Sequence, residues 1–296
     1  MVLYHTNFTF NNLQTHFHGV EIFFVISGFL ISKVSRKKTP KQFLLGRIVR
    51  IIPNYWLATA LLLTTLKMWG YWPNQHVVFS FLFIPHRSIP GLYPVLGVGW
   101  TLNIEMYCYF IFFLCILINR KYAPIICAVF IVVIQEILLI YFNSEIVNSS
   151  YAHHNVDFFV LGILIWYLSS SQTITKSISL VPPRIFILTV LSYPLIYIYT
   201  GFNKNMEVGV LCIIAILVKP TKQIRINSVL VVLGDASYSC YLLQTILIEW
   251  LRAKHILPNS ILYSTIILVS SWVIAVFWNQ TLEKPLTRKL QKLFNI

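Results

Sequence analysis

A few ionisable and polar side chains interrupt otherwise apolar stretches of this sequence, among them His5, Glu21, Glu105 and Gln244. A neutral imidazole can take a proton from a hydroxyl near pH 7, and a carboxylate can fix its tautomer and stabilise the imidazolium that forms. His5 as a base with Glu105 as its partner would therefore suit transfer chemistry on a hydroxyl. The same pair could equally be a structural hydrogen bond, and the residues alone leave both interpretations open.

Two arginines offer a different chemistry. Arg47 and Arg50 are three positions apart, which on a helix places both guanidinium groups on one face. The planar fork of arginine suits phosphate oxygens. Spacing alone nevertheless favours the simpler role of positive anchors at the cytoplasmic membrane surface.

The composition requires these side chains to be held inside a membrane. Of the 296 residues, 57% are hydrophobic and only 11% are charged, and the mean hydropathy is +0.73. Because a spanning helix needs about 20 residues, about ten helices fit, with short loops and no second soluble domain. We expect an all-α, polytopic integral membrane protein in which residues 1–296 form a single transmembrane domain, with helices at 1–10, 17–34, 51–68, 98–118, 123–142, 155–168, 185–201, 205–218, 228–250 and 261–282.

The charge distribution predicts the orientation. The chain has 23 Lys and Arg against 9 Asp and Glu, a formal net charge of +14. The largest basic group lies between two apolar runs, which favours the lipid bilayer over nucleic acid as its partner: Lys33, Arg36, Lys37, Lys38, Lys41, Arg47 and Arg50. Ten helices with both termini cytoplasmic place most Lys and Arg residues in inside loops, so we expect a multi-pass protein of the cytoplasmic (inner) membrane.

Counting about 1.5 Å per residue from the expected helix ends places His5, Glu21, Glu105 and Gln244 within about 10 Å of the outer surface. Arg47 and Arg50 fall at the opposite, cytoplasmic end. Such a layout would suit a reaction supplied from both faces.

The remaining chemistry-bearing residues receive structural interpretations. The five cysteines are in apolar runs without the close pairing of a zinc site or a disulfide framework, so we expect packing roles and no metal. Asp157 and Asp235 are expected to cap or stabilise helix ends, and Glu136 receives no role. The other histidines are expected to be solvated on the outer side: His16, His18, His76, His86, His153 and His154.

The first expected helix is short. Met1 to Phe10 would span roughly 15 Å of a hydrocarbon core about 30 Å thick. We therefore expect either an upstream start or a truncated first helix.

Seven segments in order along the chain resemble acyltransferase family 3, the multi-spanning acyltransferases that modify extracytoplasmic glycans. The resemblance extends over nearly the whole chain, and these segments carry it: VLYHTNF at 2–8, HGVEIFFVISGFLIS at 18–32, FLLGRIVRIIPNYWLA at 43–58, VGWTLNIEMYCYF at 98–110, VDFFVLGILIWYL at 156–168, LGDASYSCYLLQT at 233–245 and LEKPLTRKL at 282–290.

The resemblance implies a ten-helix fold and transfer of an acyl group, usually acetyl from cytoplasmic acetyl-CoA, to a hydroxyl of an extracytoplasmic polysaccharide or glycolipid. His5 matches the histidine that is the family's candidate base, and Glu105 matches the acidic residue after its tryptophan, Trp100. Arg47 and Arg50 match the cytoplasmic motif linked to the CoA donor.

We expect Glu21, Trp100 and Gln244 to bind substrate. Gln244 stands where family members often carry histidine. Two alternatives stay open at this point: a transporter for glycans or lipid-linked sugars that performs no chemistry, and an inactive relative that acts as a scaffold.

Overall fold

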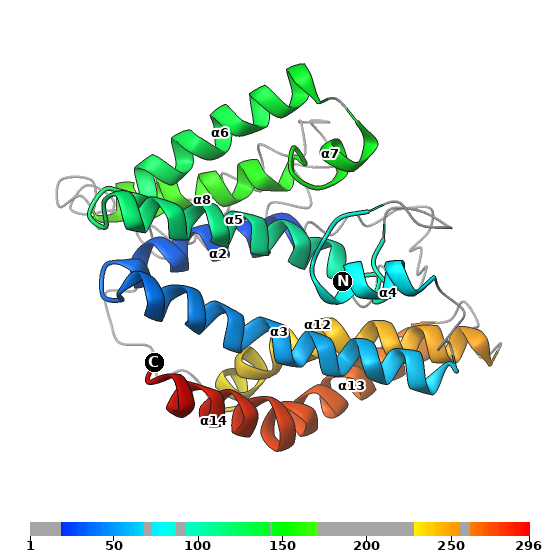
Figure 1. Cartoon of the computed structure of the whole chain (residues 1–296). Coiled ribbons are helices and arrows are strands. Elements are labelled where there is room, and N and C mark those ends of the chain that lie inside the picture. Colours follow the sequence, from blue (N-terminus) through cyan, green and yellow to red (C-terminus); the bar gives the residue numbers. More distant parts are fainter. Residues whose placement is uncertain (1–18, 68–72, 87–92, 143, 171–227, 255–260) are drawn as a thin grey trace, which may run out of the picture.

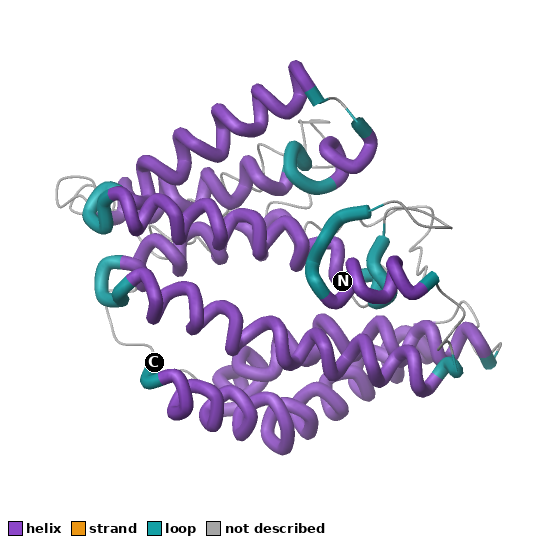
Figure 2. Tube along the Cα trace, in the orientation of Figure 1, coloured by secondary structure: helices purple, strands orange, loops and turns teal. Residues whose placement is uncertain are grey.

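The computed structural model describes residues 19–67, 73–86, 93–142, 144–170, 228–254 and 261–296. All regular elements within these ranges are helices (Figure 2), which confirms the all-α prediction for the described part of the chain. The helices expected at 1–10, 185–201 and 205–218 lie outside the described residues.

The helices form two groups that α3 and α5 join (Figure 1). The first group contains α2 (Gly19–Ser35), α5 (Gly99–Ile118), α6 (Ala123–Tyr141) and α8 (Asn155–Ser170). The second contains α3 (Pro40–Thr65), α12 (Ser228–Ala253), α13 (Ile261–Trp278) and α14 (Lys284–Phe294). Phe43 of α3 stacks on Phe112 of α5 with ring centroids 5.4 Å apart, and both side chains are buried. Packing of buried aromatic rings therefore contributes to the junction between the two groups.

Five helices among the described residues are long and apolar enough to cross a membrane: Pro40–Thr65, Gly99–Ile118, Ala123–Tyr141, Ser228–Ala253 and Thr265–Phe294. The turn between α2 and α3, the turn between α5 and α6, and the C-terminus lie at the same end of the bundle, at the left in Figure 1. Basic side chains gather at this end, including Lys37, Lys38, Arg120 and Lys121.

The boundaries of α3 correct one prediction. We expected a helix over 51–68, but the helix begins at Pro40 and ends at Thr65. Thr39 and Gln42 form a reciprocal capping box, and Pro40 occupies the first turn, where its missing N–H costs nothing. Arg47 and Arg50 consequently lie inside a helix rather than in a loop.

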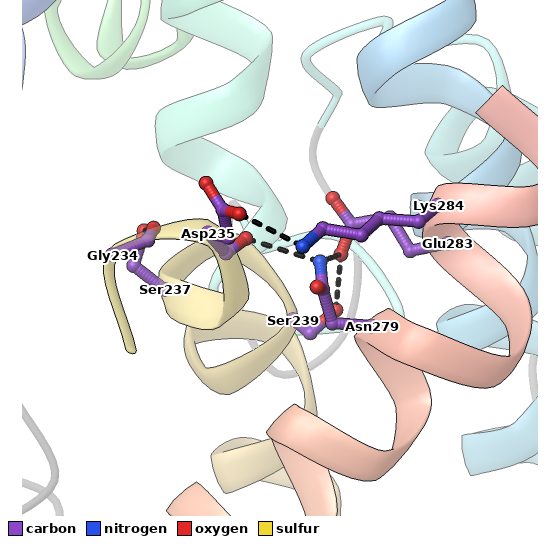
Figure 3. Close-up of polar contacts among 7 residues, drawn as sticks. All are labelled: Gly234, Asp235, Ser237, Ser239, Asn279, Glu283 and Lys284. Carbon is purple, nitrogen blue, oxygen red and sulfur yellow. Dashed lines mark hydrogen bonds and ion pairs between the residues drawn. The ribbon is translucent and has the colours of Figure 1, made fainter. Parts of the chain in front are cut away.

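The C-terminal end corrects a second prediction. Instead of ending near 282, the helix continues from α13 through a π-helical turn (Asn279–Glu283) into α14. Polar contacts hold this turn against α12 (Figure 3): Asn279 Nδ2 donates to the Asp235 carbonyl at 3.0 Å and to Glu283 Oε2 at 2.9 Å. Ser239 of α12 also donates to Glu283. Asp235 lies inside α12 rather than at its start, and it pairs with Lys284, the first residue of α14, at 2.8 Å.

Two short helices were not expected, α4 (Asn74–Phe81) and α7 (Glu145–Ser149). His76 in α4 is buried, and its Nδ1 lies 2.5 Å from Nε2 of His86. Burial, assisted by His86, lowers the pKa of His76 to about 4. The prediction that His76 is a solvated histidine was therefore wrong, because His86, from the segment after α4, packs against it.

Two glycines allow α2 and α8 to approach closely. A Cβ at Gly28 would lie 2.1 Å from the Phe159 carbonyl oxygen, and a Cβ at Gly162 would lie 2.1 Å from the Val25 carbonyl oxygen. Close backbone approach through small residues is a usual way for helices to pack in a membrane, where the hydrophobic effect does not drive their association. Gly28 and Gly162 thus set the distance between α2 and α8.

We expect Gly28→Ala or Gly162→Ala to lower the thermal stability of the purified protein, because the added methyl overpacks the crossing at a cost of about 1–3 kcal/mol. Gly234→Ala in α12 is the matched control, since a Cβ there meets nothing within 4 Å. Melting temperatures in detergent measure the effect. A loss of stability equal to that of the control would contradict the tight crossing.

Candidate active site

A buried carboxylate is the centre of the candidate site. Glu105 lies in the second turn of α5 and is 5% exposed. Tyr109, one turn further along the same helix, donates a hydrogen bond to Glu105 Oε1. The Ser27 hydroxyl of α2 lies 3.2 Å from the same oxygen and 2.7 Å from the Tyr109 oxygen. Two hydroxyls from two helices therefore hold one carboxylate oxygen.

This arrangement satisfies a group that would otherwise be costly. A carboxylate in an apolar interior is tolerated only where hydrogen bonds or opposite charges compensate its lost hydration. The α5 segment places Glu105 and Tyr109 at i and i+4, so their side chains share one helix face. Ser27 precedes Gly28 at the α2–α8 crossing, and its hydroxyl is the second group that bonds to Glu105.

The arginines reach the same site. The Arg47 guanidinium lies 5.9 Å from the centre of the Tyr109 ring, and Arg47 and Arg50 both interact electrostatically with Glu105. The simple count of residues placed the arginines and Glu105 towards opposite surfaces. Along the helices, Arg47 is roughly 10 Å from Pro40 and Glu105 is roughly 20 Å from Ile118, so Glu105 does lie nearer the opposite end. Tyr109, roughly 14 Å from Ile118, lies between these depths and contacts both residues.

A second cluster lies at the other end of α5. The Trp100 and His153 rings are 5.3 Å apart, and His153 is 4.1 Å from the ring of His154. Burial, followed by the effect of His154, lowers the pKa of His153 to about 4, while Glu21 acts in the opposite direction. A lowered pKa favours the neutral form of His153, whose ring lies against Trp100 and is close enough to Glu21 for an electrostatic effect.

Gln244 is not joined to these clusters by the described contacts. Gln244 is buried in α12, and its Nε2 has no hydrogen-bond partner among the described residues. One turn earlier, the Tyr241 hydroxyl donates to the Val98 carbonyl at 2.9 Å and lies 2.6 Å from Thr101 Oγ1, which joins α12 to the start of α5. His5 lies outside the described residues, so its pairing with Glu105 stays a prediction.

Comparison with known proteins identifies the family. A model of the acyltransferase domain, Acyl_transf_3, matches residues 1–278. The chain belongs to acyltransferase family 3. It is also 30% identical over 297 residues to the exopolysaccharide production protein ExoZ of Rhizobium meliloti (strain 1021), covering 92% of this chain and 89% of that one. No solved structure matches.

As a member of this family the protein is a membrane acyltransferase. The described residues show which interactions its buried polar groups can make. The buried carboxylate can accept a hydrogen bond and stabilise a neighbouring positive charge, and the arginines can hold an anionic group. Within the described part of the chain, no group of three or more His, Cys, Asp or Glu side chains could hold a metal ion.

Three residues of the site were not predicted from the sequence: Ser27, Tyr109 and His153. Tyr109 could have been found, because its i+4 spacing from Glu105 is visible in the sequence. Ser27 and His153 come from other segments, and no local pattern shows that they meet α5. His153 was expected to be solvated, and its contact with Trp100 corrects that prediction.

We expect Tyr109→Phe to reduce the acyl-transfer turnover number about tenfold while leaving the fold intact, since it removes one hydrogen bond to Glu105. Tyr141→Phe, at a position that is 74% exposed, is the matched control. The KM for the acyl donor should stay near that of the wild type, because Tyr109 positions the carboxylate rather than the donor. Equal turnover in the two variants would mean that Tyr109 does not position Glu105 for the reaction.

Proposed function

We propose that this family member is an O-acetyltransferase that moves an acetyl group from cytoplasmic acetyl-CoA to a hydroxyl of an extracytoplasmic polysaccharide or glycolipid. The observation that carries the proposal is the meeting of Glu105, Tyr109 and Ser27 with the arginine pair inside one helical bundle. An exopolysaccharide is the favoured acceptor, because the similar protein from Rhizobium meliloti is named for exopolysaccharide production.

In the proposed reaction, His5 takes the proton of the acceptor hydroxyl as its oxygen attacks the thioester carbonyl carbon. The C–O bond forms, the C–S bond breaks, and the CoA sulfur leaves as a thiolate that receives a proton. Glu105 stabilises the imidazolium. Oε2, to which neither Tyr109 nor Ser27 binds, is the oxygen that we expect to accept the imidazole N–H.

The donor would bind from the end of the bundle where basic side chains gather. CoA carries several phosphate charges, and the α2–α3 and α5–α6 turns supply lysines and arginines at that end. We propose that this end is cytoplasmic, as the distribution of basic residues favours. In this topology about ten helices cross the inner membrane, and both termini lie on its cytoplasmic side. No metal takes part in this proposal.

Glu21, Trp100 and Gln244 are proposed to bind the acceptor, and His153 joins them. The neutral His153 ring and Trp100 offer flat surfaces for a sugar ring, and the Glu21 carboxylate is suited to accept hydrogen bonds from its hydroxyls. The proposed acceptor site thus lies at the opposite end of α5 from the proposed donor entrance.

Inside-out membrane vesicles test the activity. Radiolabelled acetyl-CoA supplied to the outside of such vesicles should label glycan in their lumen only when the protein is present. Movement of glycan across the membrane without label would instead identify a transporter. Absence of both would identify an inactive scaffold.

The proposed pairing of His5 with Glu105 is tested by substitution. We expect His5→Ala and Glu105→Gln each to abolish acyl transfer, and the double variant to be no worse than either one, because residues that act as a unit are not additive. Normal membrane insertion, measured by detergent extraction and gel filtration, is the control. Substantial activity in His5→Ala would remove the histidine from the mechanism.

The arginine pair is tested by conservative substitution. Arg47→Lys and Arg50→Lys keep the charge, and therefore the topology, but lose the planar fork. If they bind the donor, each should raise the KM for acetyl-CoA by about five- to tenfold, which corresponds to about 1 kcal/mol, roughly the net contribution of one hydrogen bond. Arg252→Lys, at the other end of the bundle, is the control. Unchanged donor kinetics would make Arg47 and Arg50 topology anchors.

A further inference from the structure

A groove lies between α3 and α5, on the side of α5 that faces away from Glu105. It has a volume of about 340 Å³, within the range of small ligand sites. Asn103, Met106, Tyr107 and Phe110 recur at helical spacing on this face of α5, whereas Glu105 and Tyr109 belong to the other face. We call this feature the α3–α5 groove; its wall on α3 includes Trp56.

The polarity of the groove restricts what it could bind. All of its described lining residues are uncharged, and most are aromatic or aliphatic. A phosphate group or a CoA molecule would find no counter-charge on these walls. The lining therefore suits an apolar chain with a small neutral polar group.

Two buried polar atoms in this wall have no hydrogen-bond partner among the described residues. They are Oδ1 of Asn103, whose side chain is 8% exposed, and the hydroxyl oxygen of Tyr107. An unsatisfied buried polar group costs about 1–3 kcal/mol. Asn103 and Tyr107 are four positions apart and therefore share one face of α5, where a single ligand hydroxyl could donate to Asn103 Oδ1 and accept from the Tyr107 O–H.

The position of the opening indicates where such a ligand would come from. Trp56, Leu82 and Phe110 at the rim are 43%, 55% and 54% exposed. Trp56 and Phe110 belong to two of the apolar spans, α3 and α5. Trp56 is more than roughly 12 Å along α3 from Thr65, and Phe110 is more than roughly 12 Å along α5 from Gly99; these are the helix ends nearest α4. A lipid can therefore reach the Trp56 and Phe110 side of the rim from the bilayer, whereas Leu82 follows α4, which is not among the apolar spans.

We propose that the α3–α5 groove binds a neutral lipid that carries a hydroxyl beside its apolar chain, such as a diacylglycerol. The hydroxyl bonds to Asn103 and Tyr107, and the chain packs against Trp56, Met106 and Phe110. This site does not depend on the proposed acetyl transfer, because it lies on the face of α5 away from Glu105.

Photolabelling of the full-length protein in lipid nanodiscs tests the proposal. Diazirine-bearing diacylglycerol is compared with diazirine-bearing phosphatidylcholine, which has the same chains and esters but no hydroxyl. We expect the diacylglycerol to label Trp56, Met106 or Phe110 at least about fivefold more than the phosphatidylcholine does, which corresponds to about 1 kcal/mol. Equal labelling by the two lipids, or equal labelling of the groove and of Val133 on α6, would overturn the proposal.

Three variants refine the test. Tyr107→Phe keeps the ring that packs 5.1 Å from Tyr151, and Asn103→Leu keeps a similar volume; each should abolish the preference for diacylglycerol. Met106→Trp should fill the groove and remove its labelling, whereas Val133→Trp, at an exposed position on α6, should not. If soluble glycan fragments blocked the labelling, the groove would be a sugar site and the lipid proposal would be wrong.

Discussion

The structure depends on the need to hold the Glu105 carboxylate inside an apolar helical bundle. Apolar side chains offer the carboxylate no hydrogen bonds, so neighbouring helices must supply polar partners and opposite charges. Ser27 of α2 and Tyr109 of α5 supply the hydrogen bonds, and Arg47 of α3 supplies a nearby positive charge. Three helices are thereby tied to one polar group.

The close approach of α2 and α8 supports that arrangement. The crossing at Gly28 and Gly162 brings these two backbones together, and Ser27, next to Gly28, joins α2 to Glu105 and Tyr109 of α5. On the other side of the bundle, Tyr238 of α12 donates to the Ile51 carbonyl of α3 at 3.1 Å, and Trp278 donates to Asn54 at 2.6 Å. These contacts hold α3 to the C-terminal helices, so the segment that carries Arg47 and Arg50 is supported from the far side.

The two faces of α5 have different chemical character. One face carries the charged and hydroxyl groups of the candidate active site, and the other carries Asn103 and Tyr107 in an uncharged groove. Because an α-helix has about 3.6 residues per turn, these two groups of residues lie on different faces of a single regular helix. A polar reaction centre and a lipid-facing site can therefore occupy one span without sharing residues.

The sequence by itself determined the class of the protein, because hydropathy and the spacing of apolar runs specify membrane helices before any packing is known. It also singled out Glu105, Arg47 and Arg50, since ionisable groups in or beside apolar runs are conspicuous. Only the tertiary structure decided that Ser27 and Tyr109 hold Glu105, that Arg47 lies beside them, and that Asp235 pairs with Lys284. The physical reason is that such contacts join segments far apart in the chain, so they depend on helix crossings and on where each helix begins.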